Sequence, residues 1–176
     1  SSGNFSMIGS FNIVSPNGEE AWIVDDVHNI TRVPTGSSIT EARIMYSING
    51  SNGPWINITE DYDIPNDGIV ANNGSFSWQI PDSISQNVYI KIEDPLDPTV
   101  NDTSNSSFTI RGNFSILSPA GGERWVTNEA NRTINWTTTG TIPKVDIYYF
   151  KGGNLSTLTP IVLNTTNDGY YNWTIP

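Results

Sequence analysis

Short segments in which apolar and polar residues alternate run along the chain, and turn residues separate them. Within residues 42–48 the apolar side chains Ala, Ile, Tyr and Ile take every second position, and those of residues 88–92 do the same. A period of two is typical of a strand with one buried face. Asn-Gly, Asp-Gly and Gly-Gly pairs lie between the segments, and such pairs favour turns. Helical periodicity is missing from every window of about twelve residues, so the pattern predicts an all-β protein.

The chain also contains an internal repeat. FNIVSPNGEEAW at residues 11–22 and FSILSPAGGERW at residues 114–125 are 103 positions apart. NGSFSWQIP at residues 73–81 matches DGYYNWTIP at residues 168–176 after shorter loops. A repeat of about 100 residues has the size of an immunoglobulin-like sandwich.

The phase of the repeat divides the chain into three parts. Residues 1–10 correspond to the closing strand of a preceding or neighbouring repeat, residues 11–113 to one complete sandwich, and residues 114–176 to a second sandwich. The last two strands of the complete repeat, which follow Pro81, have no counterpart in the third part. The predicted fold is therefore a tandem of immunoglobulin-like or fibronectin-III-like β-sandwiches, the second of which is open. The junction at Arg111 is too short for a flexible linker, so the tandem is expected to form a semi-rigid rod.

The segments SPNGEEAW and SPAGGERW, each followed at a distance by W-x-I-P, point to a known family. The chain resembles the tandem Ig-like repeats of large bacterial and archaeal surface proteins. Its pattern is also similar to the Ser/Thr-rich cell-wall domain of fungal GPI-anchored proteins. The resemblance implies the sandwich fold but not one function, because such repeats serve as spacers, stalks and binding modules. Two positions of the first repeat depart from the second: Arg32 stands where the second has Trp136, and Glu20 where it has Gly122.

The composition narrows the classes of partner and cofactor. Eight Lys and Arg residues against 18 Asp and Glu give a net charge of −10. Without a basic face, nucleic acid and anionic membrane surfaces are not expected partners. With one His and no Cys, disulfides, iron–sulfur clusters and Cys-ligated zinc are excluded, and no cofactor is predicted. No apolar run approaches the roughly 18 residues of a membrane span.

Acceptor sites for N-linked glycans are unusually frequent. The sequon N-x-S/T, with x not Pro, occurs about three times as often as the roughly four copies that the composition predicts by chance. It occurs 13 times, at Asn4, Asn29, Asn49, Asn57, Asn73, Asn101, Asn105, Asn113, Asn131, Asn135, Asn154, Asn164 and Asn172. Simple alternation along a half-exposed strand is the competing explanation, because N-x-T fits a period of two. Since Asn is depleted in strands, we favour glycosylation of several sites, with the asparagines outward and the middle residues inward.

Sequons without cysteines favour a particular setting. Secreted eukaryotic Ig-like domains usually carry disulfides, whereas this chain has none of the residues that form them. Together with the repeat type, this indicates an extracellular or cell-surface protein of an archaeon or, second, a bacterium.

Acidic loops were the first candidates for metal chemistry. Their carboxylates have a spacing faintly like that of a calcium loop, and they are Asp61, Asp63 and Asp67 in one loop and Asp94, Asp97 and Asp102 in another. Pro65 and Asn72 occupy two positions at which an EF-hand loop needs an oxygen ligand and a Glu. Solvated loop carboxylates are therefore the favoured interpretation, and no metal site is assigned.

Two residues, His28 and Trp55, are candidates for catalysis and for sugar binding, respectively. His28 has no nucleophile or acid at a spacing that suggests a catalytic group, so no catalytic residue is assigned. Trp55 has no counterpart in the second repeat, and with Tyr46 it could stack on a sugar. Trp125 and Trp173 repeat Trp22 and Trp78 and are expected to be buried core residues.

The free closing strand suggests how the open second sandwich is completed. Residues 1–9 match the end of the complete repeat, with Phe5 and Met7 at the positions of Phe108 and Ile110. In one route this strand inserts into the open domain of another copy, and repetition gives a head-to-tail homopolymer. In the other route the chain runs on as a long tandem array. One donated strand replaces only one of the two missing strands.

The acceptor in the first route is the strand that contains Tyr171 and Trp173, which lacks the neighbours that should flank its core. These observations favour a non-enzymatic structural subunit of a heavily N-glycosylated extracellular filament, stalk or surface layer. The alternative is an adhesin or carbohydrate-binding accessory module of a secreted surface protein. Its expected partners are copies of itself and N-linked glycans.

Overall fold

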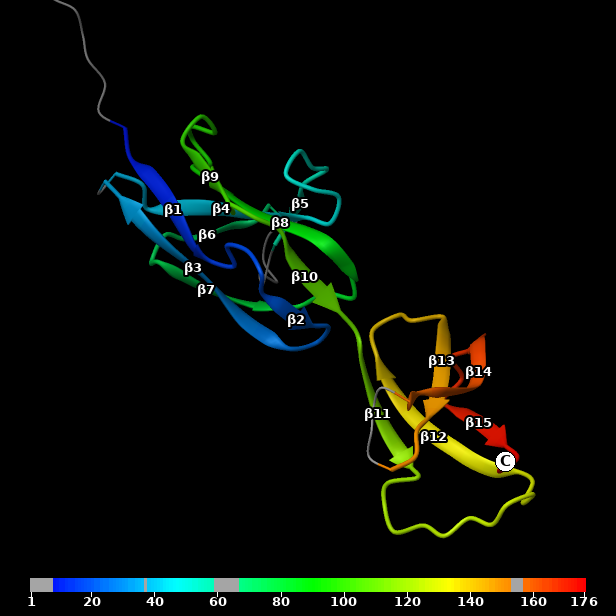
Figure 1. Ribbon diagram of the computed structural model, residues 1–176. Coiled ribbons are helices and arrows are strands. Elements are labelled where there is room, and N and C mark those ends of the chain that lie inside the picture. The colour runs from blue at the N-terminus through cyan, green and yellow to red at the C-terminus, as the bar shows by residue number, and fades with distance from the viewer. Residues whose placement is uncertain (1–7, 37, 59–66, 153–156) are drawn as a thin grey trace, which may run out of the picture. The chain divides into compact units, whose positions relative to one another are not determined.

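A computed structural model of the chain describes residues 8–36, 38–58, 67–152 and 157–176 (Figure 1). The regular elements among these residues are strands, which confirms the predicted all-β class. None of the described segments is a long apolar helix of the kind that crosses a membrane. The chain divides into two compact units, Ser1–Arg111 and Gly112–Pro176.

The first unit contains two sheets. One has the order β1-β3-β7, and the other the order β2-β10-β8-β4-β5, with β6 beside β4 and β9 beside β8. Two sheets in this order form an immunoglobulin-like or fibronectin-III-like β-sandwich. Its strands are β1 (Ser10–Ser15), β2 (Ala21–Ile23), β3 (Val27–Thr35), β4 (Glu41–Ser47), β5 (Ile56–Asn57), β6 (Ile69–Ala71), β7 (Ser75–Gln79), β8 (Ser85–Glu93), β9 (Asn101–Thr103) and β10 (Phe108–Arg111).

A single apolar core fills the space between these sheets. The alternation predicted for residues 42–48 and 88–92 places Ile44, Ile90 and Ile92 in it with no exposed surface. β3 contributes the fully buried Ile30 from the opposite sheet. The period of two in these segments therefore identified the inward face of the larger sheet, to which both β4 and β8 belong.

The second unit contains fewer strands. β11 (Asn113–Ser118), β12 (Arg132–Thr139) and β15 (Tyr170–Trp173) form one sheet, and β13 (Lys144–Tyr149) and β14 (Thr159–Thr166) form a two-stranded sheet. Ile116 of β11 lies opposite Trp136 of β12 in the same register as Ile13 opposite Arg32 in the first unit. β11, β12, β13 and β15 are thus the counterparts of β1, β3, β4 and β7.

Backbone pairing shifts both predicted boundaries by one residue. Ser10, which the sequence grouped with residues 1–9, pairs with Thr35 and begins the first sandwich. Asn113, grouped with the first sandwich, pairs with Thr139 and begins the second. The repeated sequence pattern begins one residue after the first backbone pair of each strand, so it did not show where the pairing starts.

The turn after the first strand has the same cap in both units. The Glu20 carboxylate accepts hydrogen bonds from the backbone N–H groups of residues 17 and 18, at 2.9 and 2.8 Å. Glu123 accepts from residues 120 and 121, at 2.8 Å each, and these N–H donors lower the pKa of its carboxyl group. The assignment of Gly122 as the counterpart of Glu20 was therefore wrong. Its counterpart is Glu19, and both have a positive φ, 70° for Glu19 and 87° for Gly122.

Arg32 and Trp136 differ in chemistry but serve the same contact. The Arg32 Nε donates to Asn72 Oδ1 at 3.0 Å, and the Trp136 Nε1 donates to Asn167 Oδ1 at 2.6 Å. Each asparagine then donates from Nδ2 to a loop carbonyl, that of Ile39 or that of the equivalent Ile142. The position requires a long side chain with an N–H donor, which explains how an arginine and a tryptophan can exchange there.

Replacing Asn72 by alanine is expected to destabilise the first unit by about 2–3 kcal/mol. The change removes the acceptor for the Arg32 side chain and the donor to the Ile39 carbonyl, and it leaves buried polar atoms unpaired. Chemical denaturation compares this variant with Asn52→Ala in an exposed turn, which should change the free energy of unfolding by less than about 0.5 kcal/mol. Equal effects of the two changes would show that the asparagine bridge does not stabilise the fold.

Candidate assembly groove and glycan-acceptor sites

The second unit has an apolar cavity of about 310 Å³ between its two sheets. β11, β12 and β13 supply its walls, and the residues that line it are Phe114, Ile116, Ile134, Trp136, Val145, Asp146, Ile147 and Tyr148. Asp146 is the single charged residue among them. A cavity of this kind at the place of a core is suited to apolar side chains.

Comparison with the first unit explains why this space is open. Phe11 and Ile13 are 7% and 1% exposed, whereas their counterparts Phe114 and Ile116 are 44% and 63% exposed. In the first unit β8 and β10 bring five further side chains into the core, namely Val88, Ile90, Ile92, Phe108 and Ile110. No described strand of the second unit corresponds to β8 or β10. Among the described residues, the cavity is therefore the interior of a sandwich in which no strand takes the places of β8 and β10.

The aromatic cluster at the other end of this interior is already assembled. The rings of Trp125 and Trp173 lie 6.2 Å apart at 70°, and those of their counterparts Trp22 and Trp78 lie 6.1 Å apart at the same angle. In the first unit Phe108 of β10 adds a further ring, 5.0 Å from Trp22. Among the described residues of the second unit, no ring takes that place beside Trp125.

Backbone groups are left open beside the same cluster. β10 pairs in parallel with β2, with Ile110 opposite Trp22. The equivalent residues 124–126 are not a strand, because no described strand of the second unit offers a partner there. Two edges of the open groove thus have no strand beside them among the described residues, one at residues 124–126 and one along β13, where β4 carries β8 in the first unit. At the first of these edges, the N–H and the carbonyl of Val126 are held by Glu129.

The structure corrects two of the sequence predictions. Trp125 and Trp173 are half-buried, not buried, because the strands that cover Trp22 and Trp78 have no counterparts here. The predicted acceptor strand with Tyr171 and Trp173 is β15, which is an edge strand just as β7 is in the complete unit. The missing neighbours belong to the other layer, beside residues 124–126 and β13. The predicted donor residues Phe5 and Met7 lie outside the described residues.

The sequon asparagines lie at the surface. Of those in the described residues, Asn57 and Asn135 are half-buried and the others are exposed, namely Asn29, Asn49, Asn73, Asn101, Asn105, Asn113, Asn131, Asn164 and Asn172. Asn4 and Asn154 lie outside the described residues. Three of the apolar middle residues, Ile30, Ile58 and Trp136, are buried as predicted, whereas Phe114 is 44% exposed and Trp173 is half-buried. Each described asparagine is therefore placed where a glycan could project from the fold.

Three of these asparagines lie on one face of the second unit. Asn113, Asn135 and Asn172 come from the three neighbouring strands β11, β12 and β15. They alternate with Phe114, Trp136 and the half-buried Trp173, so they project from the side of the sheet opposite the groove. Glycans on this face would leave the groove free.

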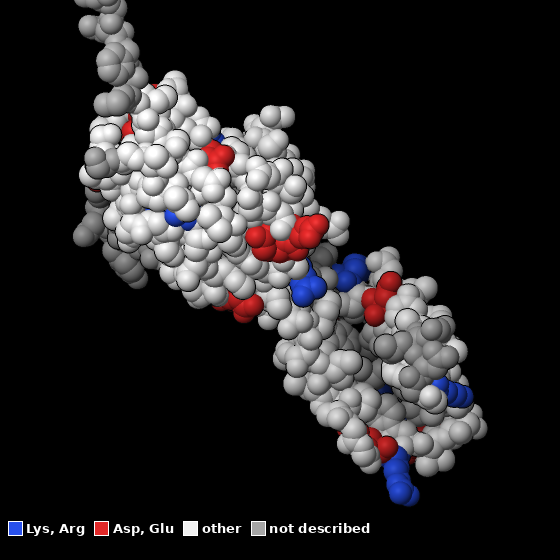
Figure 2. Space-filling view, turned by 60° about the vertical axis from the view of Figure 1, so that its left-hand side comes forward, with Lys and Arg blue, Asp and Glu red and all other residues white. Residues whose placement is uncertain are grey.

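The surface between these sites carries few charges. On the face drawn in Figure 2, Lys, Arg, Asp and Glu side chains form small patches, and broad areas without charge lie between them. The described residues contain no group of three His, Cys, Asp or Glu side chains placed to hold a metal ion. Asp61 and Asp63 of the first acidic loop lie outside the described residues.

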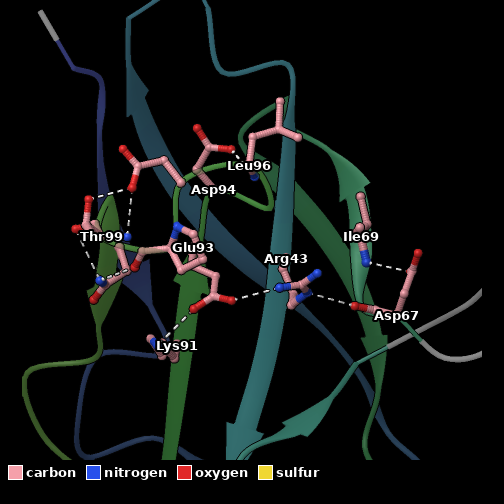
Figure 3. A network of polar contacts seen from close by, with 11 residues as sticks. Arg43, Asp67, Ile69, Lys91, Glu93, Asp94, Leu96 and Thr99 are labelled. Atoms are coloured by element: carbon pink, nitrogen blue, oxygen red, sulfur yellow. Dashed lines mark hydrogen bonds and ion pairs between the residues drawn. The ribbon is translucent and has the colours of Figure 1, made fainter. Parts of the chain in front are cut away.

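The remaining loop carboxylates are engaged in local hydrogen bonds (Figure 3). Asp67 accepts from the N–H of Ile69, Asp94 from that of Leu96, and Asp97 from both the N–H and the hydroxyl of Thr99. Asp102 accepts from the Ile13 N–H at 2.7 Å. Their described contacts are those of turn formation and of strand attachment.

Glu93 is the one buried carboxylate of this region, 6% exposed. It lies 3.0 Å from Arg43 Nη1 and 2.8 Å from Lys91 Nζ (Figure 3). Burial raises the pKa of Glu93. The hydrogen bonds and charges of Lys91 and Arg43 lower it by more than burial raises it, so that the pKa lies below its usual value. The Arg43–Glu93 ion pair joins the neighbouring strands β4 and β8, whereas Lys91 lies on β8 together with Glu93.

Protonation of Glu93 should therefore weaken the first unit at low pH. A carboxyl group whose pKa is lowered by folding stabilises the fold above its unfolded pKa, and this contribution disappears as the pH falls through the folded value. Glu93→Gln is expected to lower the free energy of unfolding by about 1–3 kcal/mol near neutral pH, with the difference from wild type shrinking below about pH 4. Denaturation across this pH range compares it with Glu41→Gln, an exposed position on the neighbouring strand β4. A constant difference at all pH values would contradict the assignment.

The structure does not place Trp55 or His28 in a binding or catalytic site. Tyr46 is buried and packs against Trp78 with ring centroids 5.2 Å apart, so it cannot form a sugar platform with the half-buried Trp55. The imidazole of His28 stacks on Trp22, with centroids 4.6 Å apart and planes within 1°. This stacking covers one face of a core tryptophan and explains His28 structurally.

No protein-family model matches the chain, and no curated protein matches it either. Among solved structures, the chain is similar to the fibronectin(III)-like modules of Clostridium thermocellum CbhA, with 14% sequence identity. That match covers 94% of this chain and 79% of the other, with a TM-score of 0.28. The fold class follows from the strand order of the first unit and not from this likeness.

Proposed function

We propose that this protein is a structural subunit of an N-glycosylated extracellular filament or surface array, in which Ig-like units join end to end. The observation that carries the proposal is the open apolar interior of the second unit beside a complete, closed first unit. An uncovered sandwich interior with unpaired backbone edges invites strand addition. Addition at one end of a chain by a different part of another copy is a heterologous contact, which propagates into a filament where its rotation does not close a ring.

The surface supports the same role. The described sequon asparagines are exposed or half-buried, and three of them share the face opposite the groove. Glycans placed in this way would cover outward faces without blocking the joining surface. They would also keep exposed strands of neighbouring filaments from pairing.

Electron microscopy of material from the native source tests the proposed function directly. We expect extended fibres or a regular array built from this chain, identified by labelling with an antibody to the first unit. Dispersed single particles at all protein concentrations would contradict the proposal.

Glycan occupancy gives a second prediction. We expect Asn113, Asn135 and Asn172 to carry sugar in native material, because all three side chains project from the same outward face of the second unit. Mass spectrometry of proteolytic peptides, before and after removal of N-glycans, measures occupancy at each site. Unmodified asparagine at all three positions would contradict the glycan part of the proposal, while leaving end-to-end joining to be judged by microscopy.

A further inference from the structure

We infer that the partner at the Trp125 end of the groove is a second copy of this chain, which donates its residues 4–8 as a strand parallel to residues 124–126. The inference rests on the proposed end-to-end joining and assigns its partner, strand direction and register. The donated strand takes the place that β10 has in the first unit.

The first unit supplies the template for this contact. There β10 lies in parallel beside β2, with Thr109 opposite Ala21 and Ile110 opposite Trp22. Phe108 and Ile110 are 1% and 0% exposed, so both point into the core. The second unit retains the tryptophan pair in the same geometry but has neither the strand nor its phenylalanine among the described residues.

Two glycines show that the donor segment is in phase with β10. A Cβ on Gly112 would overlap the Thr139 carbonyl oxygen and the Ile142 side chain, and a Cβ on Gly9 would overlap the equivalent Thr35 and Ile39. Each glycine thus enters its own sandwich by the same close backbone approach. The residues before Gly9 therefore precede the first unit in the same phase in which β10 precedes the second unit. β10 completes the sandwich that precedes its glycine, not the one that follows it.

The sequence of the donor segment has the required alternation. Residues 4–9, NFSMIG, match SFTIRG at residues 107–112, which places Phe5 at the position of Phe108 and Met7 at that of Ile110. Ile8, which is 71% exposed, then corresponds to the exposed Arg111. The segment thus has two apolar side chains for the groove.

The register follows from the template pairs. Ser6 lies opposite Arg124, Met7 opposite Trp125, and Ile8 opposite Val126, with the Phe5 ring against Trp125 in the place that Phe108 has beside Trp22. This strand occupies the place of β10 alone, so the edge of β13 stays accessible. That feature distinguishes donation from completion by a two-strand hairpin, which would cover both edges.

Disulfide trapping tests the inference, because the chain has no cysteine of its own. A chain with Ser6→Cys and Arg124→Cys should form a ladder of oligomers on oxidation, visible on a non-reducing gel. A mixture of the two single variants should stop at dimers. Ile8→Cys with Val126→Cys probes the same register and serves if the first pair disturbs folding. Ser6→Cys with Asp146→Cys, which places the second thiol on β13, should give roughly tenfold less product, because directly opposed residues meet the geometry of a disulfide.

The outcomes separate this inference from the proposed function. Trapping at residues 124 and 126, with little at 146, supports it. Fibres in the microscope with trapping only at 146, or with none at either edge, would overturn the inference while leaving the filament role intact. Dispersed particles without trapping would overturn both.

Discussion

Trp22→Ala should lower the free energy of unfolding of the first unit by about 3–5 kcal/mol, the cost expected for emptying the site of a large buried aromatic side chain. Trp22 is 6% exposed and contacts Trp78, Phe108 and His28. The equivalent Trp125→Ala change, measured on unassembled protein, should cost the second unit about 1–2 kcal/mol because that ring is half-buried.

Calorimetry that resolves the unfolding of each unit checks this pair of values. The two substitutions are chemically identical and occupy equivalent positions, so their difference measures what the covering strands contribute. Equal costs in both units would mean that the second core is as well covered as the first, and the open groove would then be wrong.

Phe5→Asp is expected to abolish end-to-end assembly. A carboxylate in place of the phenyl ring would have to be buried against Trp125 without a partner, which is strongly unfavourable. We expect the protein concentration needed for assembly to rise by roughly a hundredfold or more. The melting temperatures of both units, measured on unassembled protein, should be unchanged. Sedimentation velocity over a series of concentrations gives this threshold.

Ile8→Asp is the matched control for this experiment. Ile8 belongs to the same segment and is also apolar, but its counterpart Arg111 is charged and exposed. The control should assemble close to the wild-type threshold. A similar loss in both variants would indicate a general effect of charge in the segment and would contradict the inward orientation of Phe5.

Much of the fold could be predicted because local pattern and repetition agree. Alternation identified Ile44, Ile90 and Ile92 as inward residues, and the repeat predicted which strands of the second unit would be missing. These features depend on neighbours in sequence and on the period of two, both of which the chain displays directly.

Other features depended on contacts between distant residues. The parallel pairing of β2 with β10 joins residues about 88 positions apart, and nothing in the short segment Ala21–Ile23 marks it as a strand. The presence of Arg32 in one unit and Trp136 at the equivalent position of the other is explained only by the hydrogen bonds that both side chains donate to an asparagine distant in sequence, Asn72 or Asn167. The half-buried state of Trp125 likewise follows from a missing neighbour and not from its own surroundings in sequence.

Amide hydrogen exchange at Trp125 and Thr127, whose counterparts Trp22 and Val24 face β10 in the first unit, tests the central claim most directly. These N–H groups should exchange slowly in the assembled full chain and rapidly in a chain that lacks residues 1–8, because a donated strand protects this edge in one case and is absent in the other. Adding a peptide of residues 1–9 to the shortened chain should restore the protection. Equal exchange rates in the full and shortened chains, at a concentration where the full chain is assembled, would contradict strand donation.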